Sequence, residues 1–184
     1  MSHRAIAPVL IAAAAALLAV PAVAQSYTPP ERMPAKGASD AWGNANLVVA
    51  QEKRAGNTAG FDAGFEYFVC RHVSAGAAIG FYRASLEGGH VNVAYLDAIA
   101  AHHFVVSRYV DPWIQGGLGA YRTDLGRLGT SATIKLGGFG GAGADFFLTR
   151  SFAVDVAARY HVAHSAEGVQ GNFLELGGGI KFYF

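Results

Sequence analysis

The chain has 184 residues, of which 52% are hydrophobic and 15% charged, and it carries 24 glycines, one cysteine and a formal net charge of +1. This composition excludes collagen-like, disordered and disulfide-stapled proteins, and Cys70 has no second cysteine with which to pair. Beyond residue 24 no stretch reaches the ~20 uninterrupted apolar residues that a membrane helix needs, so any membrane span has to be a β-barrel.

Residues 1–24 have the pattern of a secretory signal peptide. His3 and Arg4 precede an apolar run, Pro21 ends this run, and residues 22–24 supply the small side chains at which a signal peptidase cleaves. We expect the segment to be removed and the rest of the chain to be exported. Without Arg4 the basic and acidic residues are equal in number, so we expect no basic footprint for nucleic acid.

The exported part divides into a short lead-in and one domain. Residues 25–41 contain three prolines and are predicted to be a flexible N-terminal lead-in. Residues 42–184 contain a single proline, Pro112, and are predicted to form the domain. Because proline cannot donate to a strand ladder, a stretch with so little proline can be β-sheet throughout.

Eight segments of this domain alternate apolar and polar residues with the period of two that is typical of β-strands. They cover residues 43–54, 59–69, 73–86, 90–104, 111–124, 132–147, 151–164 and 172–184. Glycine-rich or polar connections alternate with tight ones, as expected when the two kinds of loop lie at opposite ends of an antiparallel sheet. Asp97 shares the parity of the apolar Val93 and Tyr95, so we expect a bulge or a different register in the fourth segment.

This pattern predicts an all-β fold, an eight-stranded antiparallel up-and-down transmembrane β-barrel. A soluble lipocalin-like barrel alternates in the same way. Three features favour the membrane barrel: the polar face carries few charges and many glycines, aromatic residues gather towards strand ends, and the chain ends on an apolar, aromatic face. This last face, made of Leu176, Ile180, Phe182 and Phe184, resembles the C-terminal signal by which bacterial outer-membrane barrels are recognised for insertion. The resemblance implies contact with the barrel-assembly machinery.

A barrel of eight strands is only wide enough for its own side chains to fill, so we do not expect an open pore. Charged side chains on the inner face then have to pair, because an isolated buried ion is costly. The residues expected to form these interior polar pairs are Asp62, Glu66, Lys135, Asp145, Asp155, Arg159 and Lys181. We expect their role to be structural.

Two motifs that point to other chemistry are set aside. Residues 138–143 match a dinucleotide-binding glycine pattern, but the strand alternation runs on through them, so we expect these glycines to relieve crowding. His161 and His164 lie an odd number of residues apart, and therefore on opposite faces of a strand, which disfavours a shared metal ion. We expect no metal and no cofactor.

One place in the sequence offers a candidate serine nucleophile. His164 and Ser165 are expected near a rim of the barrel, with Glu175 on the facing strand. A catalytic serine needs a base within hydrogen-bond reach and a third group that orients this base. These three residues are therefore the candidate catalytic site. The competing interpretation is that Ser165 starts a loop, Glu175 joins the interior pairs, and His164 lies at the level of the lipid headgroups.

The leader, the glycine-rich alternating strands, and residues 143–149 leading to residues 158–160 resemble the small eight-stranded outer-membrane β-barrels of Gram-negative bacteria, the OmpA- and OmpW-like group. The resemblance implies a location in the bacterial outer membrane, with outer-membrane lipid and lipopolysaccharide as partners. The first functional hypothesis is a non-enzymatic membrane protein that is structural or interacts with lipid or ligands. A conduit for small apolar solutes is a further alternative.

The second half of the chain is also similar to the lipid A 3-O-deacylases, the PagL-like acyloxyacyl hydrolase barrels. The counterparts of the motifs of that family are residues 103–104, 116–119, 137–148 and 159–166. Without gaps, the catalytic His and Ser of the family fall on Val162 and His164, and a shifted alignment recovers His164, Ser165 and Glu175. This resemblance implies, as an alternative function, a serine esterase that acts on lipopolysaccharide, or an inactive relative of one.

Overall fold

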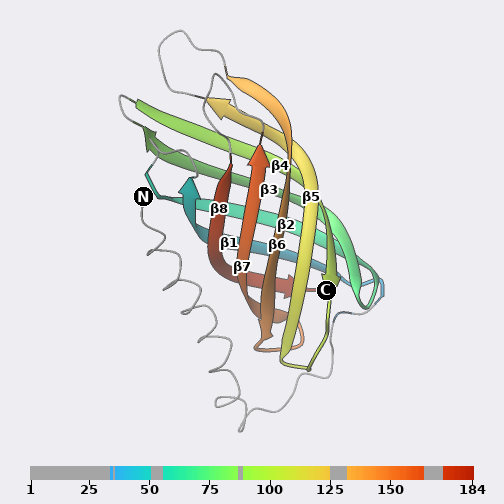
Figure 1. The fold of residues 1–184 in the computed structure, drawn as a ribbon. Coiled ribbons are helices and arrows are strands. Elements are labelled where there is room, and N and C mark those ends of the chain that lie inside the picture. Colours follow the sequence, from blue (N-terminus) through green and yellow to red (C-terminus); the bar gives the residue numbers. More distant parts are fainter. Residues whose placement is uncertain (1–33, 35, 51–55, 87–88, 125–131, 164–171) are drawn as a thin grey trace.

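The computed structural model describes residues 34, 36–50, 56–86, 89–124, 132–163 and 172–184 (Figure 1). These residues form eight strands: β1 (Ser39–Ala50), β2 (Thr58–Cys70), β3 (Val73–Leu86), β4 (Gly89–His103), β5 (Val110–Asp124), β6 (Thr133–Phe147), β7 (Phe152–Ala163) and β8 (Phe173–Tyr183). Each strand pairs antiparallel with its neighbour in the chain, and β1 also pairs with β8, so the sheet closes into a barrel. The predicted all-β, eight-stranded antiparallel barrel is confirmed. No helix in the described ranges is long and apolar enough to cross a membrane.

The barrel has two distinct ends (Figure 1). At the end that we call the loop end, β1, β3, β5 and β7 finish and β2, β4, β6 and β8 begin. At the opposite end, which we call the turn end, the connections are residues 71–72, 104–109 and 148–151. The start of β1 and the C-terminal Phe184 also lie at the turn end, where the backbone of Ser39 and that of Phe184 are hydrogen-bonded to each other.

The predicted segments agree with the observed strands to within a few residues, and the largest difference is at the start of the barrel. β1 begins at Ser39, whereas the sequence placed the start of the barrel at residue 42. Polar residues at this point resemble a loop, but the Asp40 side chain is fully buried inside the barrel, 3.8 Å from the Lys181 ammonium. The predicted signal peptide, residues 1–24, lies outside the described residues.

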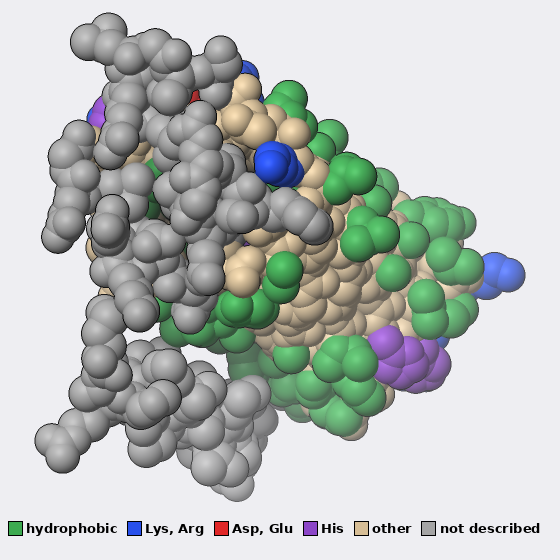
Figure 2. Space-filling view, turned by 45° about the horizontal axis from the view of Figure 1, so that its top comes forward, with side chains coloured by type: hydrophobic (Ala, Val, Ile, Leu, Met, Phe, Trp, Pro, Cys, Tyr) green, Lys and Arg blue, Asp and Glu red, His purple; other side chains and the backbone are tan. Residues whose placement is uncertain are grey.

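Side chains alternate between the outer wall and the interior along the strands. In β2, Phe61 and Phe65 are 65% and 46% exposed on the outer wall, while Asp62 and Glu66 are buried inside. Hydrophobic side chains cover much of the face of the barrel shown in Figure 2. This is the apolar-out pattern of a membrane barrel rather than the apolar-in pattern of a lipocalin-like barrel.

β4 keeps an uninterrupted register with both of its neighbours, so the bulge or shifted register expected at Asp97 does not occur. Three side chains of this strand point into the barrel: Val93, Tyr95 and Asp97. Val93 and Tyr95 belong to a cluster of buried apolar and aromatic side chains near the loop end. The apolar parity of this strand is therefore its inner face. A register shift occurs instead in β2, between Phe68 and Cys70, next to the turn.

Inward-facing glycines make room for large side chains on neighbouring strands. Gly80 lies against the Tyr95 ring and Gly143 against the Trp113 ring, and a Cβ atom on either glycine would overlap that ring. Residues 138–143 lie within β6, so this glycine run is part of a strand, as the alternation predicted. These two aromatic rings thus occupy the space that a side chain on each glycine would take.

Candidate functional site

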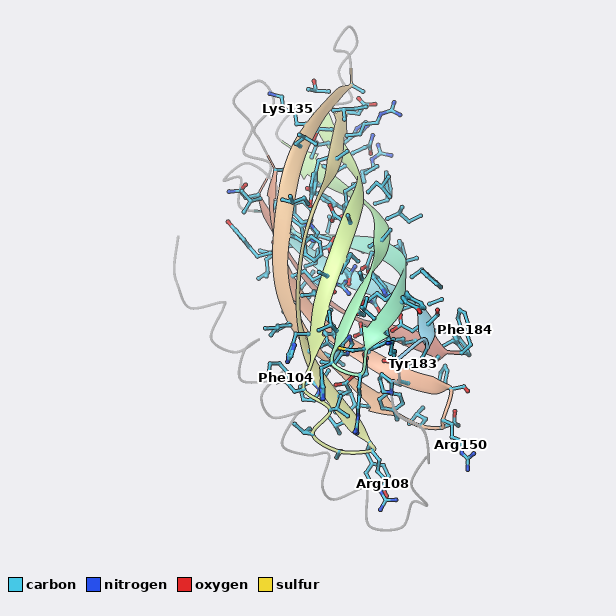
Figure 3. All side chains as sticks on the ribbon, turned by 90° about the vertical axis from the view of Figure 1, so that its right-hand side faces the viewer. Phe104, Arg108, Lys135, Arg150, Tyr183 and Phe184 are labelled. Carbon is cyan, nitrogen blue, oxygen red and sulfur yellow. The ribbon has the colours of Figure 1, made fainter. Side chains whose placement is uncertain are left out.

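Six of the seven residues predicted to form interior pairs are buried inside the barrel: Asp62, Glu66, Asp145, Asp155, Arg159 and Lys181. Lys135 is different, because its side chain is exposed at the loop end (Figure 3). It pairs in register with the buried Tyr121 and so has the inward parity, but it lies close to the start of β6, where the barrel ends. The odd or even position of a residue in a strand decides whether its side chain points inward or outward. Its distance from the strand end decides whether an inward side chain is also buried.

One ion pair crosses the interior of the barrel. Arg159 on β7 contacts Asp62 on β2, with 2.5 Å between Nη1 and Oδ2, although these two strands are not neighbours in the sheet. Asn46 donates a further hydrogen bond to Asp62 at 2.7 Å. The Arg159 guanidinium also lies 4.7 Å from the centre of the Trp42 ring, which is a cation–π contact. The pair is therefore held by groups from three strands.

A second group of charges lies around Asp145, nearer the turn end. Lys181 donates a hydrogen bond to Asp145 at 3.0 Å and lies 3.8 Å from Asp40. Asp145 also accepts hydrogen bonds from the Tyr183 hydroxyl at 2.5 Å and from the Trp113 indole at 3.3 Å. Donors from β5 and β8 thus converge on one carboxylate of β6.

A third group, which sequence reasoning missed, is a hydrogen-bonded chain across β2, β3, β4 and β5. Ser74 Oγ lies 3.1 Å from His103 Nε2, and His103 Nδ1 lies 2.7 Å from a carboxylate oxygen of Asp111. This is the order of groups in a Ser–His–Asp triad. Ser74, however, is fully buried and donates its hydroxyl proton to Glu66. A nucleophile has to reach its substrate, and the buried Ser74 hydroxyl does not. This hydrogen-bonded network is therefore structural.

Glu175, from the predicted catalytic site, faces the interior and is 2% exposed. Its carboxylate accepts hydrogen bonds from the Tyr95 hydroxyl at 3.0 and 3.1 Å and lies 3.2 Å from His161 Nε2. The other two predicted catalytic residues, His164 and Ser165, lie outside the described residues. The position of Glu175 is the one given by the competing interpretation, in which it joins the interior pairs.

The interior holds more acidic than basic side chains. The buried acidic residues are Asp40, Asp62, Glu66, Asp97, Asp111, Asp145, Asp155 and Glu175. The buried basic residues among those described are His103, Arg159, His161 and Lys181. The apolar outer wall therefore encloses an acidic compartment, which the near-zero net charge of the sequence did not indicate.

Three interior donors lie close enough to share a metal ion, because ligand atoms of His103, Asp111 and Asp145 are all within 4.8 Å of one another. Both ring nitrogens of His103 are already engaged, by Asp111 and by Ser74. A cation here would also compete with the Lys181 ammonium, 3.0 Å from Asp145. The donor set therefore fits a hydrogen-bond network better than a metal centre.

Of the four residues predicted to form the insertion signal, Leu176, Ile180 and Phe182 lie on the outer wall of β8, and Phe184 directly follows this strand. Ile180, Phe182 and Phe184 are 47%, 49% and 64% exposed, and Leu176 is half-buried. The Phe182 ring packs 5.0 Å from that of Phe152 on β7. The last strand thus offers an apolar, partly aromatic outer face that ends at the turn end.

The fold and the distribution of side chains define the class of protein: a closed eight-stranded antiparallel barrel with an apolar outer wall, which encloses both charged and aromatic side chains. No family model matches the sequence, and no curated protein matches it significantly. The barrel is similar to solved structures of outer-membrane and surface proteins.

Neisserial surface protein A superposes with a TM-score of 0.67 at 18% identity, over 81% of this chain and 100% of that protein. The outer membrane protein OprG from Pseudomonas aeruginosa gives a TM-score of 0.60 at 11% identity, over 84% and 99% of the two chains. The outer membrane protein AlkL gives 0.60 at 15% identity, over 87% and 96%. The predicted resemblance to small outer-membrane barrels is confirmed for the fold, and the similarity to lipid A deacylases stays a prediction.

Proposed function

We propose that this chain is an integral protein of the bacterial outer membrane whose barrel is filled by its own side chains. It acts as a structural or lipid-interacting protein rather than as an open pore. The apolar outer wall supports the membrane location, since side chains such as Leu118 and Leu136, 75% and 77% exposed, would otherwise face water. Outer-membrane lipid, including lipopolysaccharide, is then the immediate partner of this wall, and the apolar outer face of β8 is the contact for the barrel-assembly machinery.

The burial of the interior carboxylates carries the proposal that the barrel is closed. Asp40, Asp111 and Asp145 are 0% exposed, and Asp97 and Asp155 are 1% exposed, so these interior carboxylates are shielded from solvent. In a water-filled channel the same carboxylates would line the water. Aromatic contacts and hydrogen bonds across the lumen, such as that from Tyr95 to Glu175, support a lumen occupied by protein side chains.

Reconstitution of the exported chain into planar lipid bilayers tests this function. We expect strand-rich circular dichroism and a heat-modifiable shift on gels, which show insertion, together with no conductance steps above the protein-free bilayer. Liposomes that carry the barrel should likewise take up small apolar solutes no faster than empty liposomes. Stable single-channel steps from inserted protein would contradict the closed barrel, and a helical spectrum would contradict the membrane barrel itself.

The alternative function is a lipid A 3-O-deacylase-like esterase, which rests on the sequence resemblance. Its proposed orienting group, Glu175, is engaged with Tyr95 and His161 inside the barrel, on the face away from the lipid. We therefore expect identical lipid A mass spectra from cells that express the wild type and cells that express Ser165→Ala. Loss of one acyl chain in the wild type alone would instead establish the esterase.

A further inference from the structure

The exposed and buried charges of the barrel differ in sign. All described Lys and Arg residues except Arg159 and Lys181 are exposed: Lys36, Arg71, Arg83, Arg108, Arg122, Lys135 and Arg150. Among the described Asp and Glu residues, only Asp124 lies outside the barrel interior. Within the part of the chain that the structure describes, the outer surface is therefore basic, because every described acidic side chain except Asp124 is enclosed.

The three turns at the turn end share one local pattern, an exposed aliphatic residue followed two positions later by an exposed arginine. The pairs are Val69 and Arg71, Val106 and Arg108, and Leu148 and Arg150. The aliphatic side chains are 53%, 67% and 48% exposed. Residues 71–72, 104–109 and 148–151 contain no Asp or Glu. Each turn thus presents a hydrocarbon group and a cation at the same tip.

Aromatic side chains surround these tips on the outer wall. Phe104, Phe182 and Phe184 are 48%, 49% and 64% exposed. Figure 3 shows Arg108 and Arg150 at the extreme of the turn end, with Phe104 and Phe184 closer to the wall. Aromatic side chains at the interface, with cations beyond them, match the change from acyl chains to headgroups across a membrane surface.

We propose that the turn end binds anionic phospholipid. The guanidinium groups of Arg71, Arg108 and Arg150 hold lipid phosphates, and the aliphatic residue of each turn lies among the upper acyl carbons. Arginine suits this role because its planar fork of N–H donors matches phosphate oxygens. A membrane surface is a better partner than a soluble acidic protein, since the hydrocarbon and the cation occur together in all three turns. The inference rests on the proposed membrane function. It adds that the lipids in contact with the turn end carry anionic headgroups.

The described residues at the loop end do not show the same arrangement. Arg122 lines a shallow hollow of about 260 Å³ on the outer wall together with Asp124, so a carboxylate lies beside this cation. Lys135, also at this end, has the inward parity rather than the outward one. Attraction for an anionic headgroup is therefore expected to be stronger at the turn end.

The test is the lipid selectivity of the exported chain, reconstituted in phosphatidylcholine vesicles with spin-labelled phosphatidylglycerol or spin-labelled phosphatidylcholine. The motionally restricted fraction in the electron paramagnetic resonance spectrum gives the relative association of the two lipids. For the wild type we expect phosphatidylglycerol to be preferred by about threefold or more at low salt, and less at high salt. In the triple variant Arg71→Gln, Arg108→Gln, Arg150→Gln the ratio should fall close to one.

Two matched variants locate the effect. The triple variant with lysine at the same three turn positions keeps the charge and should retain most of the preference. The loop-end variant Arg83→Gln, Arg122→Gln should keep most of it as well. Equal association of both lipids with the wild type, or a preference that disappears only in the loop-end variant, would overturn the inference. Heat-modifiable insertion is scored on the same samples, so a chain that fails to insert refutes the proposed function, whereas an inserted chain without selectivity refutes the inference alone.

Discussion

At the scale of single residues, the glycines that face the interior set the space for the aromatic side chains. Gly80→Ala would drive a Cβ atom into the Tyr95 ring, so we expect a loss of about 1–3 kcal/mol in the free energy of unfolding from overpacking. The matched control is Gly140→Ala, also in a strand, because nothing lies within 4 Å of a Cβ atom there. Apparent melting temperatures from the heat-modifiable gel shift compare the two, and equal values would contradict the packing argument.

At the scale of strands, polar bonds inside the barrel join elements that the sheet does not pair. The Arg159–Asp62 pair connects β7 with β2, and Tyr95 with Glu175 connects β4 with β8. Because Arg159→Leu leaves Asp62 buried without its cation, we expect a cost of about 3–5 kcal/mol in denaturant unfolding in detergent. Asp62→Asn in the same chain should recover much of this loss. A small effect of the single substitution would mean that the pair is hydrated.

The same strands show how far the sequence predicts the structure. Period-two alternation gave the number of strands and the inward parity of Asp62 and Arg159, because side-chain direction is a local property of a strand. It did not give partners across the lumen, which depend on how the sheet closes. Ser74, His103 and Asp111 come from three strands and look unrelated in sequence. Asp40 resembles a loop residue until the pairing of β1 with β8 places it beside Lys181.

At the scale of the whole molecule, the nearly equal numbers of basic and acidic residues in the sequence, 14 and 13, conceal their separation in space. Alternation places eight carboxylic acids inside the barrel and leaves the described arginines, except Arg159, outside. Net charge does not report the basic character of the described outer surface, because it sums over two compartments that closure of the barrel separates. The membrane meets only the outer compartment.

Closure of the barrel also predicts which thiols can react. Cys70 is exposed at the end of β2, whereas Ser74, four residues later, is fully buried. A maleimide should therefore label Cys70 rapidly in the folded wild type. In the double variant Cys70→Ser, Ser74→Cys, labelling should wait for unfolding by heat, because the new thiol lies in the sealed interior. Mass spectrometry of samples quenched over time measures both rates. Rapid labelling of the folded double variant would contradict this prediction, because it would show that small molecules reach the Ser74–His103–Asp111 network. These three groups would then be accessible to a substrate.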